Sequence, residues 1–278
     1  EDLRIDYSIL DQHAESYRKI RNTFRYLLGN IQDQYENLDF EKVKFENFDS
    51  LEKYMLHRIY TINENFKNNF KVYNFHNLYK ELLNFCTVEL SAFYFDIRKD
   101  TLYCEALDSE KRKNCIILLN IILQCLLKWL APILSFTTEE IYQLVKKEED
   151  NQSIHLQNFV SVPSSWRNEE LSLDWEYVKK IRDEANISIE NMRAEKSIGS
   201  SLEAIIEIKL NKEFYDKAKD INFSEICITS SSSVIKDENL KNSIDVVAKK
   251  AQGTKCPVCW KIFESSCERH GHLNLNGQ

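Results

Sequence analysis

The chain has 278 residues, a formal net charge of −7 and a hydrophobic content of 43%, which is enough for a buried core and leaves room for two domains. Five glycines and three prolines are few for this length, so long helices are expected rather than many turns. The acidic balance excludes a general electrostatic attraction to nucleic acid. Any such binding has to come from a local basic surface.

Segments with the apolar period of a helix follow one another through the first half of the chain. Helices are predicted at 6–34, 49–72, 74–95, 109–131 and, from a capping box at 137–140, up to about 147. Because Asn120, Gln124 and Lys128 interrupt the most apolar run, 116–134, a buried core helix is favoured there over a membrane span. Long helices with modest connections indicate an up-and-down bundle over 1–150.

The second half of the chain has a different composition. Residues 151–200 are predicted to form a polar linker and a junction helix at 174–196, which Gly199 ends. The alternation in SLEAIIEIKL indicates a strand, followed by a helix at 212–219, a second strand at 224–230 and a serine loop at 230–233. These elements predict a small β-α-β domain over 201–248, with a separate module at 249–278. The predicted fold class is therefore mainly α.

Three of the eight cysteines and a histidine gather near the end of the chain. Cys256-x2-Cys259 and Cys267-x2-His270 form two pairs, and each pair can wrap a tight turn around one side of a tetrahedral Zn²⁺ ion. A disulfide would leave one of these cysteines unpaired. His272 is an alternative fourth ligand, although His270 keeps the spacing. The remaining cysteines are predicted to be reduced core residues: Cys86, Cys104, Cys115, Cys125 and Cys227.

Basic and aromatic residues surround the predicted zinc ligands, which gives the module two possible uses. It is either a structural cap or a surface that meets nucleic acid, and the spacing does not decide between them. The surrounding residues are Lys249, Lys250, Lys255, Trp260, Lys261 and Arg269.

A second basic surface is predicted on the first helix. Arg18, Arg21, Asn22 and Arg25 are three, four and seven positions apart, so they share one helical face away from the apolar stripe. A solvated surface is the ordinary interpretation of such a face. The alternative is RNA binding, since guanidinium groups bind phosphates and an asparagine can contact a base edge.

Several stretches, in order along the chain, resemble the C-terminal region of bacterial isoleucyl-tRNA synthetases. They are SYRKIRNTFRYLLGNIQD (16–33), LSAFYFDIRKDTLYC (90–104), LAPILSFTTEEIY (130–142), RAEKSIGSSLEA (193–204) and KCPVCW (255–260). The chain departs from that family at its last zinc ligand, where CERH stands in place of a second CxxC pair.

The resemblance implies a helical anticodon-binding domain followed by a terminal zinc module, within a longer monomeric, cytoplasmic enzyme that attaches isoleucine to its tRNA using ATP. The HIGH and KMSKS motifs of the catalytic domain do not occur in this sequence, so the chain is expected to bind tRNA without catalysing the reaction. By the same resemblance, Arg193 and Lys196 are expected near the RNA backbone, with salt bridges to Glu190 or Glu195 as the alternative. Trp260 is expected either to stack on a loop base or to pack beneath the zinc knuckle.

A competing hypothesis is a zinc-containing helical module that binds another protein. The acidic balance and the lack of a catalytic set support it. A metallo-hydrolase is excluded, because four protein ligands leave zinc no open coordination position and no general base is apparent nearby.

Overall fold

The computed structural model describes residues 6–146, 152–240 and 242–271. The chain divides into two compact units: unit 1 comprises Glu1–Leu102 and Ala106–Asn168, and unit 2 comprises Tyr103–Glu105 and Glu169–Gln278. Unit 1 is helical, whereas the strands belong to unit 2. The predicted fold class, mainly α with a small mixed unit, is confirmed.

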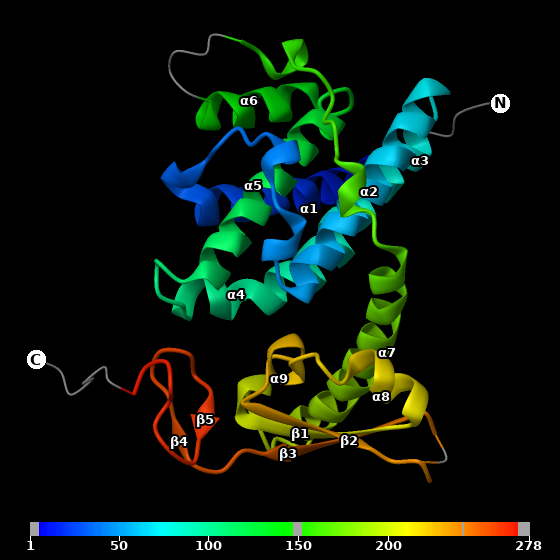
Figure 1. The fold of residues 1–278 in the computed structure, drawn as a ribbon. Helices are drawn as coiled ribbons and strands as arrows, with labels where there is room; N and C mark the ends of the chain where they lie inside the picture. The colour runs from blue at the N-terminus through cyan, green and yellow to red at the C-terminus, as the bar shows by residue number, and fades with distance from the viewer. Residues whose placement is uncertain (1–5, 147–151, 241, 272–278) are drawn as a thin grey trace, which may run out of the picture. The chain divides into compact units, whose positions relative to one another are not determined.

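Unit 1 is a bundle of long helices (Figure 1). They are α1 (Tyr7–Ile31), α2 (Ser50–Lys71), α3 (Phe75–Asn84), α4 (Phe95–Cys104), α5 (Glu110–Leu130) and α6 (Ser135–Val145). Short 3-10 turns lie at Gln32–Gln34, Phe40–Lys42, Phe45–Asn47, Ile154–Leu156 and Ser164–Trp166. The last two turns fall in the predicted linker, where Ile154 and Trp166 are buried in unit 1.

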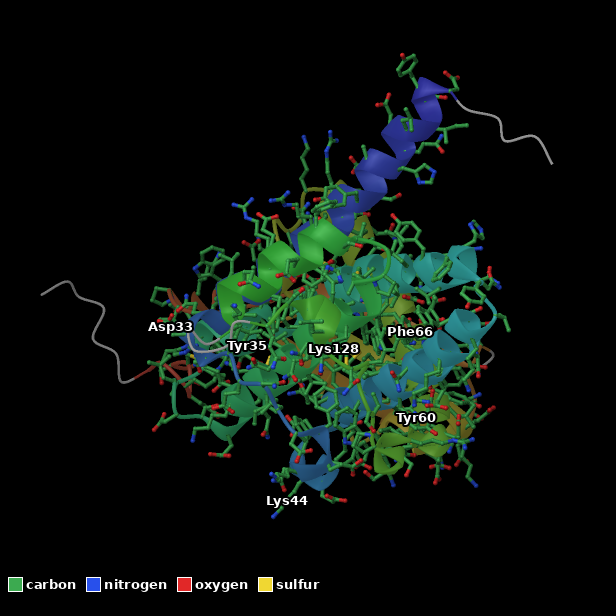
Figure 2. The ribbon with its side chains drawn as sticks, turned by 90° about the horizontal axis from the view of Figure 1, so that it is seen from above. Asp33, Tyr35, Lys44, Tyr60, Phe66 and Lys128 are labelled. Carbon is green, nitrogen blue, oxygen red and sulfur yellow. The ribbon has the colours of Figure 1, made fainter. Side chains whose placement is uncertain are left out.

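The apolar stripe of α1 is buried only in its second half. Ile20, Phe24 and Leu27 are fully buried, because this half packs against α5 and the segment that follows α3. Leu10, which continues the same stripe, is 54% exposed. Figure 2 shows the first turns of α1 extending beyond the other helices of the unit. The predicted stripe is therefore correct in period but longer than the part that packs.

Helix α5 forms the centre of unit 1 and contacts α1, α2 and α6. Two of its polar residues have partners: the side-chain amides of Asn120 and Gln124 donate to the carbonyls of Gln34 and Glu36 at 3.1 and 2.9 Å. Among the described residues it is the one helix long and apolar enough to cross a membrane, and 78% of its most apolar window is buried inside the fold. That burial agrees with the predicted core helix.

Two helix boundaries in unit 1 differ most clearly from the sequence prediction. The third helix was expected to end near residue 95, but α3 continues through a π-helical segment, Phe85–Tyr94, directly into α4. A π turn contains an extra residue, so the buried face of the helix shifts. The apolar positions beyond it no longer follow the 3.6-residue period on which the prediction was based. Helix α6 begins at Ser135, before the predicted capping box, which is therefore wrong. The Thr138 hydroxyl instead donates to the Leu134 carbonyl at 3.1 Å within the first turn.

Unit 2 places helices on a three-stranded sheet (Figure 1). Its elements are α7 (Glu169–Ala194), β1 (Ala204–Leu210), α8 (Lys212–Ala218), α9 (Phe223–Ile226), β2 (Ser231–Lys236) and β3 (Ile244–Lys250), with a 3-10 turn at Ser201–Glu203. The strand order is β2-β1-β3, parallel between β1 and β2 and antiparallel between β1 and β3. Buried and half-buried residues alternate along β1, and α7 and α8 are the helices that contact it.

The second predicted strand, 224–230, is wrong. Those residues form α9 and a turn, and β2 begins at Ser231, within the serine run that was expected to be a loop. Serine has little preference for strands, so the pairing is supplied by the backbone, with Ser231 opposite Ile205 of β1. Strand β3 was not predicted at all.

The C-terminal segment of unit 2 forms a two-stranded ribbon around the cysteines. Strands β4 (Thr254–Lys255) and β5 (Ile262–Phe263) are antiparallel, with Thr254 opposite Phe263. Gly253 precedes β4 with a φ of +123°, and a Cβ atom built there would lie 2.1 Å from the Phe263 carbonyl oxygen. Only glycine fits that position.

Candidate metal centre and nucleic-acid interface

The four predicted zinc ligands come together in unit 2. The ligand atoms of Cys256, Cys259, Cys267 and His270 all lie within 4.8 Å of one another, and all four side chains are buried. The Sγ atoms of Cys259 and Cys267 are 4.0 Å apart, too far for a disulfide, whose bond is about 2.05 Å long. The described cysteines are all free thiols.

The distances within this cluster match the edges of a zinc tetrahedron. Bonds of about 2.3 Å to sulfur and about 2.1 Å to nitrogen place two sulfurs about 3.8 Å apart, and a sulfur and a nitrogen about 3.6 Å apart. The observed distances are 4.0 Å between the two sulfurs, and 3.5 and 3.4 Å from His270 Nδ1 to the Sγ atoms of Cys256 and Cys267. The residues present therefore fit one tetrahedral Zn²⁺ ion. The alternative ligand His272 lies outside the described residues.

A hydrogen bond fixes which nitrogen of His270 faces the thiols. Its Nε2 lies 2.9 Å from the carbonyl oxygen of Cys104. A carbonyl only accepts, so Nε2 carries the proton and Nδ1 is left with a free lone pair directed at the sulfurs. Such an outer contact orients metal-binding histidines in general. Beside it, Arg269 Nη1 donates to Glu105 Oε1 at 2.7 Å, so residues of Tyr103–Glu105 brace the histidine side of the cluster.

The two cysteines of the first ligand pair, Cys256 and Cys259, differ in their thiol pKa. Burial raises the pKa of Cys256, but hydrogen bonds, chiefly from the backbone N–H groups of Cys259 and Val258, outweigh burial and bring the pKa to about 6. For Cys259, burial is the largest cause and raises the pKa to about 11. A thiolate at Cys256 at neutral pH is the form that binds a metal ion.

Sequence reasoning placed Cys104 in the core, and the structure corrects this. Its side chain is half-buried and packs against the cysteine cluster, where its Sγ lies 3.6 Å from the Val258 carbonyl oxygen. Cys86, Cys115, Cys125 and Cys227 are buried as predicted. Burial raises the pKa of Cys86, Cys115 and Cys227 to about 12, so those thiols stay protonated.

Trp260 follows the first knuckle with its ring turned to solvent. The side chain is 60% exposed, so it does not pack beneath the knuckle. Its φ is +64°, in the left-handed region that a tryptophan rarely adopts. The backbone N–H donates to the Cys256 carbonyl at 2.9 Å, and Lys255 Nζ lies 5.8 Å from the ring centroid. The tight turn around the ligands thus presents a basic and aromatic pair to solvent.

The four predicted RNA-contacting residues of α1 are exposed: Arg18, Arg21, Asn22 and Arg25. We call this set the arginine ridge. It lies on the opposite side of α1 from the buried stripe, so none of its side chains belongs to the apolar core. Arg25 has no ionic or hydrogen-bonding partner among the described residues.

Two acidic residues meet the ridge, one of which the sequence did not reveal. Glu15 pairs with Arg18 at 3.1 Å within α1, whereas Glu140 of α6 lies 3.6 Å from Arg21. Beside that pair, the hydroxyls of Tyr17 and Thr137 are 2.9 Å apart. The first turns of α6 therefore lie against the ridge. This proximity depends on helix packing and has no signal in the local sequence.

The other predicted contacts lie at the end of α7 in unit 2. Arg193 donates to Glu190 at 2.7 Å, so the salt-bridge alternative is present, although 48% of the arginine side chain stays exposed. Lys196 is exposed, its backbone N–H donates to the Arg193 carbonyl at 3.0 Å, and its φ is +57°. Lys196 and Trp260 are two of the few non-glycine residues at positive φ, a feature that recurs at functional sites.

Comparison with known proteins agrees with this arrangement. Residues 52–209 match the family model described as "Anticodon-binding domain of tRNA ligase", which is more than half of the chain. The match covers α2 to α6, α7 and most of β1.

Relatives extend the similarity to nearly the whole sequence. The chain is 60% identical over 272 residues to an isoleucine–tRNA ligase of Pelagibacter ubique (strain HTCC1062), covering 97% of the chain and 29% of the relative. It is 37% identical to the corresponding enzyme of Agrobacterium fabrum over 94% of the chain and 27% of the relative. The resemblance predicted from the motifs is confirmed, and the chain spans less than a third of the length of these relatives. On the strength of the family model, the chain belongs to the anticodon-binding domains of tRNA ligases.

Proposed function

We propose that this chain is the anticodon-binding part of an isoleucine–tRNA ligase and that its partner is the anticodon stem-loop of tRNA(Ile). The observation that carries the proposal is the 60% identity to such an enzyme over 97% of the chain. The parent enzyme joins isoleucine to its tRNA at the expense of ATP, acts as a monomer in the cytoplasm, and holds its catalytic groups outside the segment that this chain represents.

The RNA contacts come from both units. Arg18, Arg21 and Arg25 bind phosphates, and Asn22 contacts a base edge. Arg193 and Lys196 bind the backbone, while Trp260 stacks on an unpaired loop base. The exposure of all seven side chains supports these roles. The proposed division of labour follows the predicted domains: a bundle at 1–150, a linker and junction helix at 151–200, a small domain at 201–248 and a zinc module at 249–278.

The proposed metal is one structural Zn²⁺ ion held by Cys256, Cys259, Cys267 and His270. Four protein ligands close the tetrahedron, so the ion supplies folding free energy and no catalytic chemistry. The fit of three distances between ligand atoms to a tetrahedron supports the assignment. The ion holds the knuckle turn that presents Trp260 and Lys255.

The test is RNA binding by the complete 278-residue chain, measured by gel shift with an unmodified tRNA(Ile) transcript over a range of salt concentrations. Arg25→Ala is expected to weaken binding about ten-fold, since hydrogen bonds between charged groups contribute about 1.5–3 kcal/mol. It should also reduce the slope of log affinity against log salt by about 0.9 on the double-stranded stem. Glu140→Gln releases Arg21 from its ion pair and should strengthen binding.

A matched control separates a local contact from a change in overall charge. Glu110→Gln makes the same charge change on α5, at a side chain that is 83% exposed, and should alter the affinity by less than about two-fold at 0.15 M salt, where distant charges are screened. If Glu140→Gln and Glu110→Gln behave alike and Arg25→Ala binds like the wild type, the arginine ridge is not an RNA site. If the wild-type chain does not bind tRNA at all, a protein-binding zinc module becomes the better assignment.

A further inference from the structure

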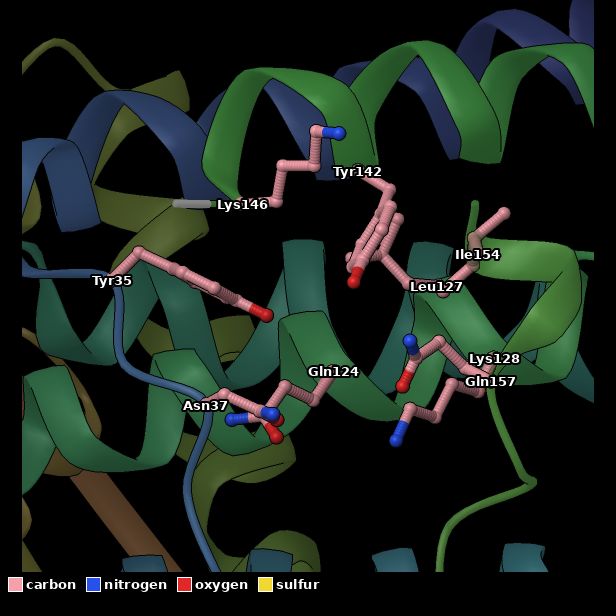
Figure 3. A pocket seen from close by; sticks show the side chains of 9 residues that line it. All are labelled: Tyr35, Asn37, Gln124, Leu127, Lys128, Tyr142, Lys146, Ile154 and Gln157. Carbon is pink, nitrogen blue, oxygen red and sulfur yellow. The ribbon is translucent and has the colours of Figure 1, made fainter. Parts of the chain in front are cut away.

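A pocket opens in unit 1 among α5, α6 and the segment that follows α1 (Figure 3). Its volume is about 220 Å³. Figure 3 shows the rings of Tyr35 and Tyr142 directed toward the same space, with the amine of Lys146 above it and that of Lys128 below it. The remaining polar lining includes the amides of Asn37 and Gln124. None of these residues belongs to the arginine ridge.

The size of the pocket restricts what it can hold. Water occupies about 30 Å³ per molecule in the liquid, so the space corresponds to about seven waters. Pockets for drug-sized ligands and cofactors measure about 300–1,000 Å³. One mononucleotide is the largest unit of a nucleic acid that suits this space, whereas a dinucleotide is too large.

The charge of the pocket is positive in a chain whose overall charge is negative. Lys128 and Lys146 line it, and no carboxylate does so among the described residues. Burial lowers the pKa of Lys128, and this lysine has no ionic partner among the described residues. The acidic residues 148–150 follow Lys146 in the sequence and lie outside the described residues. A partly desolvated cation without a counter-charge is unfavourable, and an anionic ligand would offset that penalty.

The rest of the lining is typical of contacts to a nucleobase. Two tyrosine rings offer flat apolar surfaces, and bases that leave a stack are commonly held on such rings. The amide nitrogen of Gln124 donates to the Glu36 carbonyl at 2.9 Å, which fixes the orientation of that amide. Asn37 has no partner among the described residues, so its amide is available for a base edge. Aromatic faces, amides and a cation together favour a nucleotide over a plain inorganic anion.

We propose that this pocket holds one unstacked nucleotide of the RNA bound by unit 1, with its base between Tyr35 and Tyr142 and its phosphate on Lys128. The inference rests on the proposed tRNA binding and adds a second contact region to the arginine ridge. Its chemistry is that of a nucleoside monophosphate unit. The two possible sources of that unit, a nucleotide within an RNA loop and a free mononucleotide, are distinguished below by separate measurements.

The first measurement compares two lysines on the same helix. Lys128→Met keeps most of the side-chain volume and removes the charge, and it should weaken binding of a synthetic tRNA(Ile) anticodon stem-loop about ten-fold, with a salt slope smaller by about 0.7. Lys113→Met makes the same change near the start of α5, where Lys113 pairs with Glu110 at 2.8 Å. This control should bind within about two-fold of the wild type, because its charge is exposed and screened.

The second measurement locates the base. 2-Aminopurine is placed at each loop position of the stem-loop in turn, and its fluorescence reports stacking. One position should change its fluorescence on binding to the wild-type chain, and the change should disappear with Tyr35→Leu. Lys128→Arg keeps the positive charge and should bind the stem-loop like the wild type. This variant tests the role of the charge even if Lys128→Met folds poorly. Circular dichroism melting checks the fold of every variant.

The outcomes separate this inference from the proposed function. If Lys128→Met and Lys113→Met bind the stem-loop equally well while Arg25→Ala still impairs binding, the pocket is not an RNA site and the tRNA assignment stands. If AMP alone saturates the pocket in a titration and no loop position responds to Tyr35→Leu, the site takes a free nucleotide and the RNA assignment of the pocket is wrong. If the wild-type chain binds no RNA, both proposals fail together.

Discussion

The bundle of unit 1 and the C-terminal segment around β4 and β5 offer exposed groups to a partner in different ways. In the bundle, large side chains such as Trp129 and Trp166 are fully buried, and the arginine ridge is a surface of a helix fixed by that core. Around the cysteines, the buried cluster consists of Cys256, Cys259 and Cys267, with Val258 and Phe263 partly buried against it. A segment this short has too little apolar area to fold alone.

The two surfaces therefore depend on different sources of free energy. Burial of apolar side chains contributes about 25 cal/mol per Å² and is spread over many residues, so the ridge tolerates small changes in its surroundings. The turn that carries Trp260 depends on four ligand atoms. If the proposed zinc site is correct, loss of one ligand or of the ion removes most of what holds this turn.

The largest expected effect comes from removing the metal. Cys256→Ser, or treatment of the wild-type chain with a chelator, should release about one Zn²⁺ per chain and unfold the segment around β4 and β5, because apparent zinc affinities in short metal-folded segments are about 10–16 kcal/mol. Hydrogen exchange of residues 254–271 should rise by several orders of magnitude. Exchange in α5 should stay unchanged, because the core of unit 1 contains none of the ligands.

The control for this experiment is a buried cysteine outside the cluster. Cys125→Ser lies in α5, where burial raises the thiol pKa above its usual range, and should leave the zinc content at one per chain. Metal analysis that finds no zinc in the intact chain would contradict the assignment. So would a Cys256→Ser variant that keeps its ion and its slow exchange.

A smaller effect is expected from breaking the buried ion pair of the bundle. Arg98 of α4 donates from Nη2 to Glu52 of α2 at 2.6 Å, and both side chains are 3% exposed. Tyr94 also donates to Glu52 at 3.1 Å. Arg98→Met leaves the carboxylate buried without its positively charged partner, so it should lower the free energy of unfolding by about 3–5 kcal/mol. Urea denaturation followed by circular dichroism measures the change.

The matched variant replaces both partners. Because an apolar pair of similar volume avoids the desolvation of two charges, Glu52→Leu combined with Arg98→Met should recover most of the lost stability. A double variant as unstable as the single one would show that the pair contributes through specific geometry. The wild type, the single variant and the double variant should retain the same amount of zinc, because the ion pair lies in unit 1 and the proposed metal ligands lie in unit 2.

The ligand set shows how far local spacing carries a prediction. Cys256, Cys259, Cys267 and His270 are close in sequence, and the geometry of two short turns was enough to bring them together. The groups that hydrogen-bond to His270 and Arg269 could not be foreseen, because Cys104 and Glu105 are distant in the sequence and reach them only through tertiary structure. The pairing of Arg21 with Glu140 was missed for the same reason.

Two of the missed features have a weak or ambiguous local signal, whereas β3 contains Ile244, Val246 and Val247, a strand preference that was overlooked. The alternation of Ala204, Ile206 and Ile208 predicts β1, and the strand is found there. Strand β2 consists largely of serines and forms because its backbone pairs with β1. The π-helical segment Phe85–Tyr94 is as apolar as an ordinary core helix, so composition predicts a helix but not its wider turn. Tertiary pairing and packing decide these cases.

The smallest expected effect on stability concerns Trp260. Its substitution distinguishes a role of the ring in RNA binding from a role in folding of the C-terminal segment. At a φ of +64°, glycine is the favoured residue, so Trp260→Gly should relieve backbone strain and change the stability of the zinc-bound segment by less than about 1 kcal/mol. The substitution removes the ring, which is 60% exposed and on which a loop base is proposed to stack. The binding free energy for the tRNA(Ile) stem-loop should therefore weaken by about 1–3 kcal/mol, the contribution of one stacked base. Trp260→Phe keeps a ring and should bind more tightly than the glycine variant. Zinc loss in Trp260→Gly, measured by metal analysis, would instead mean that the tryptophan holds the knuckle together, and the metal would then not suffice to fold this segment.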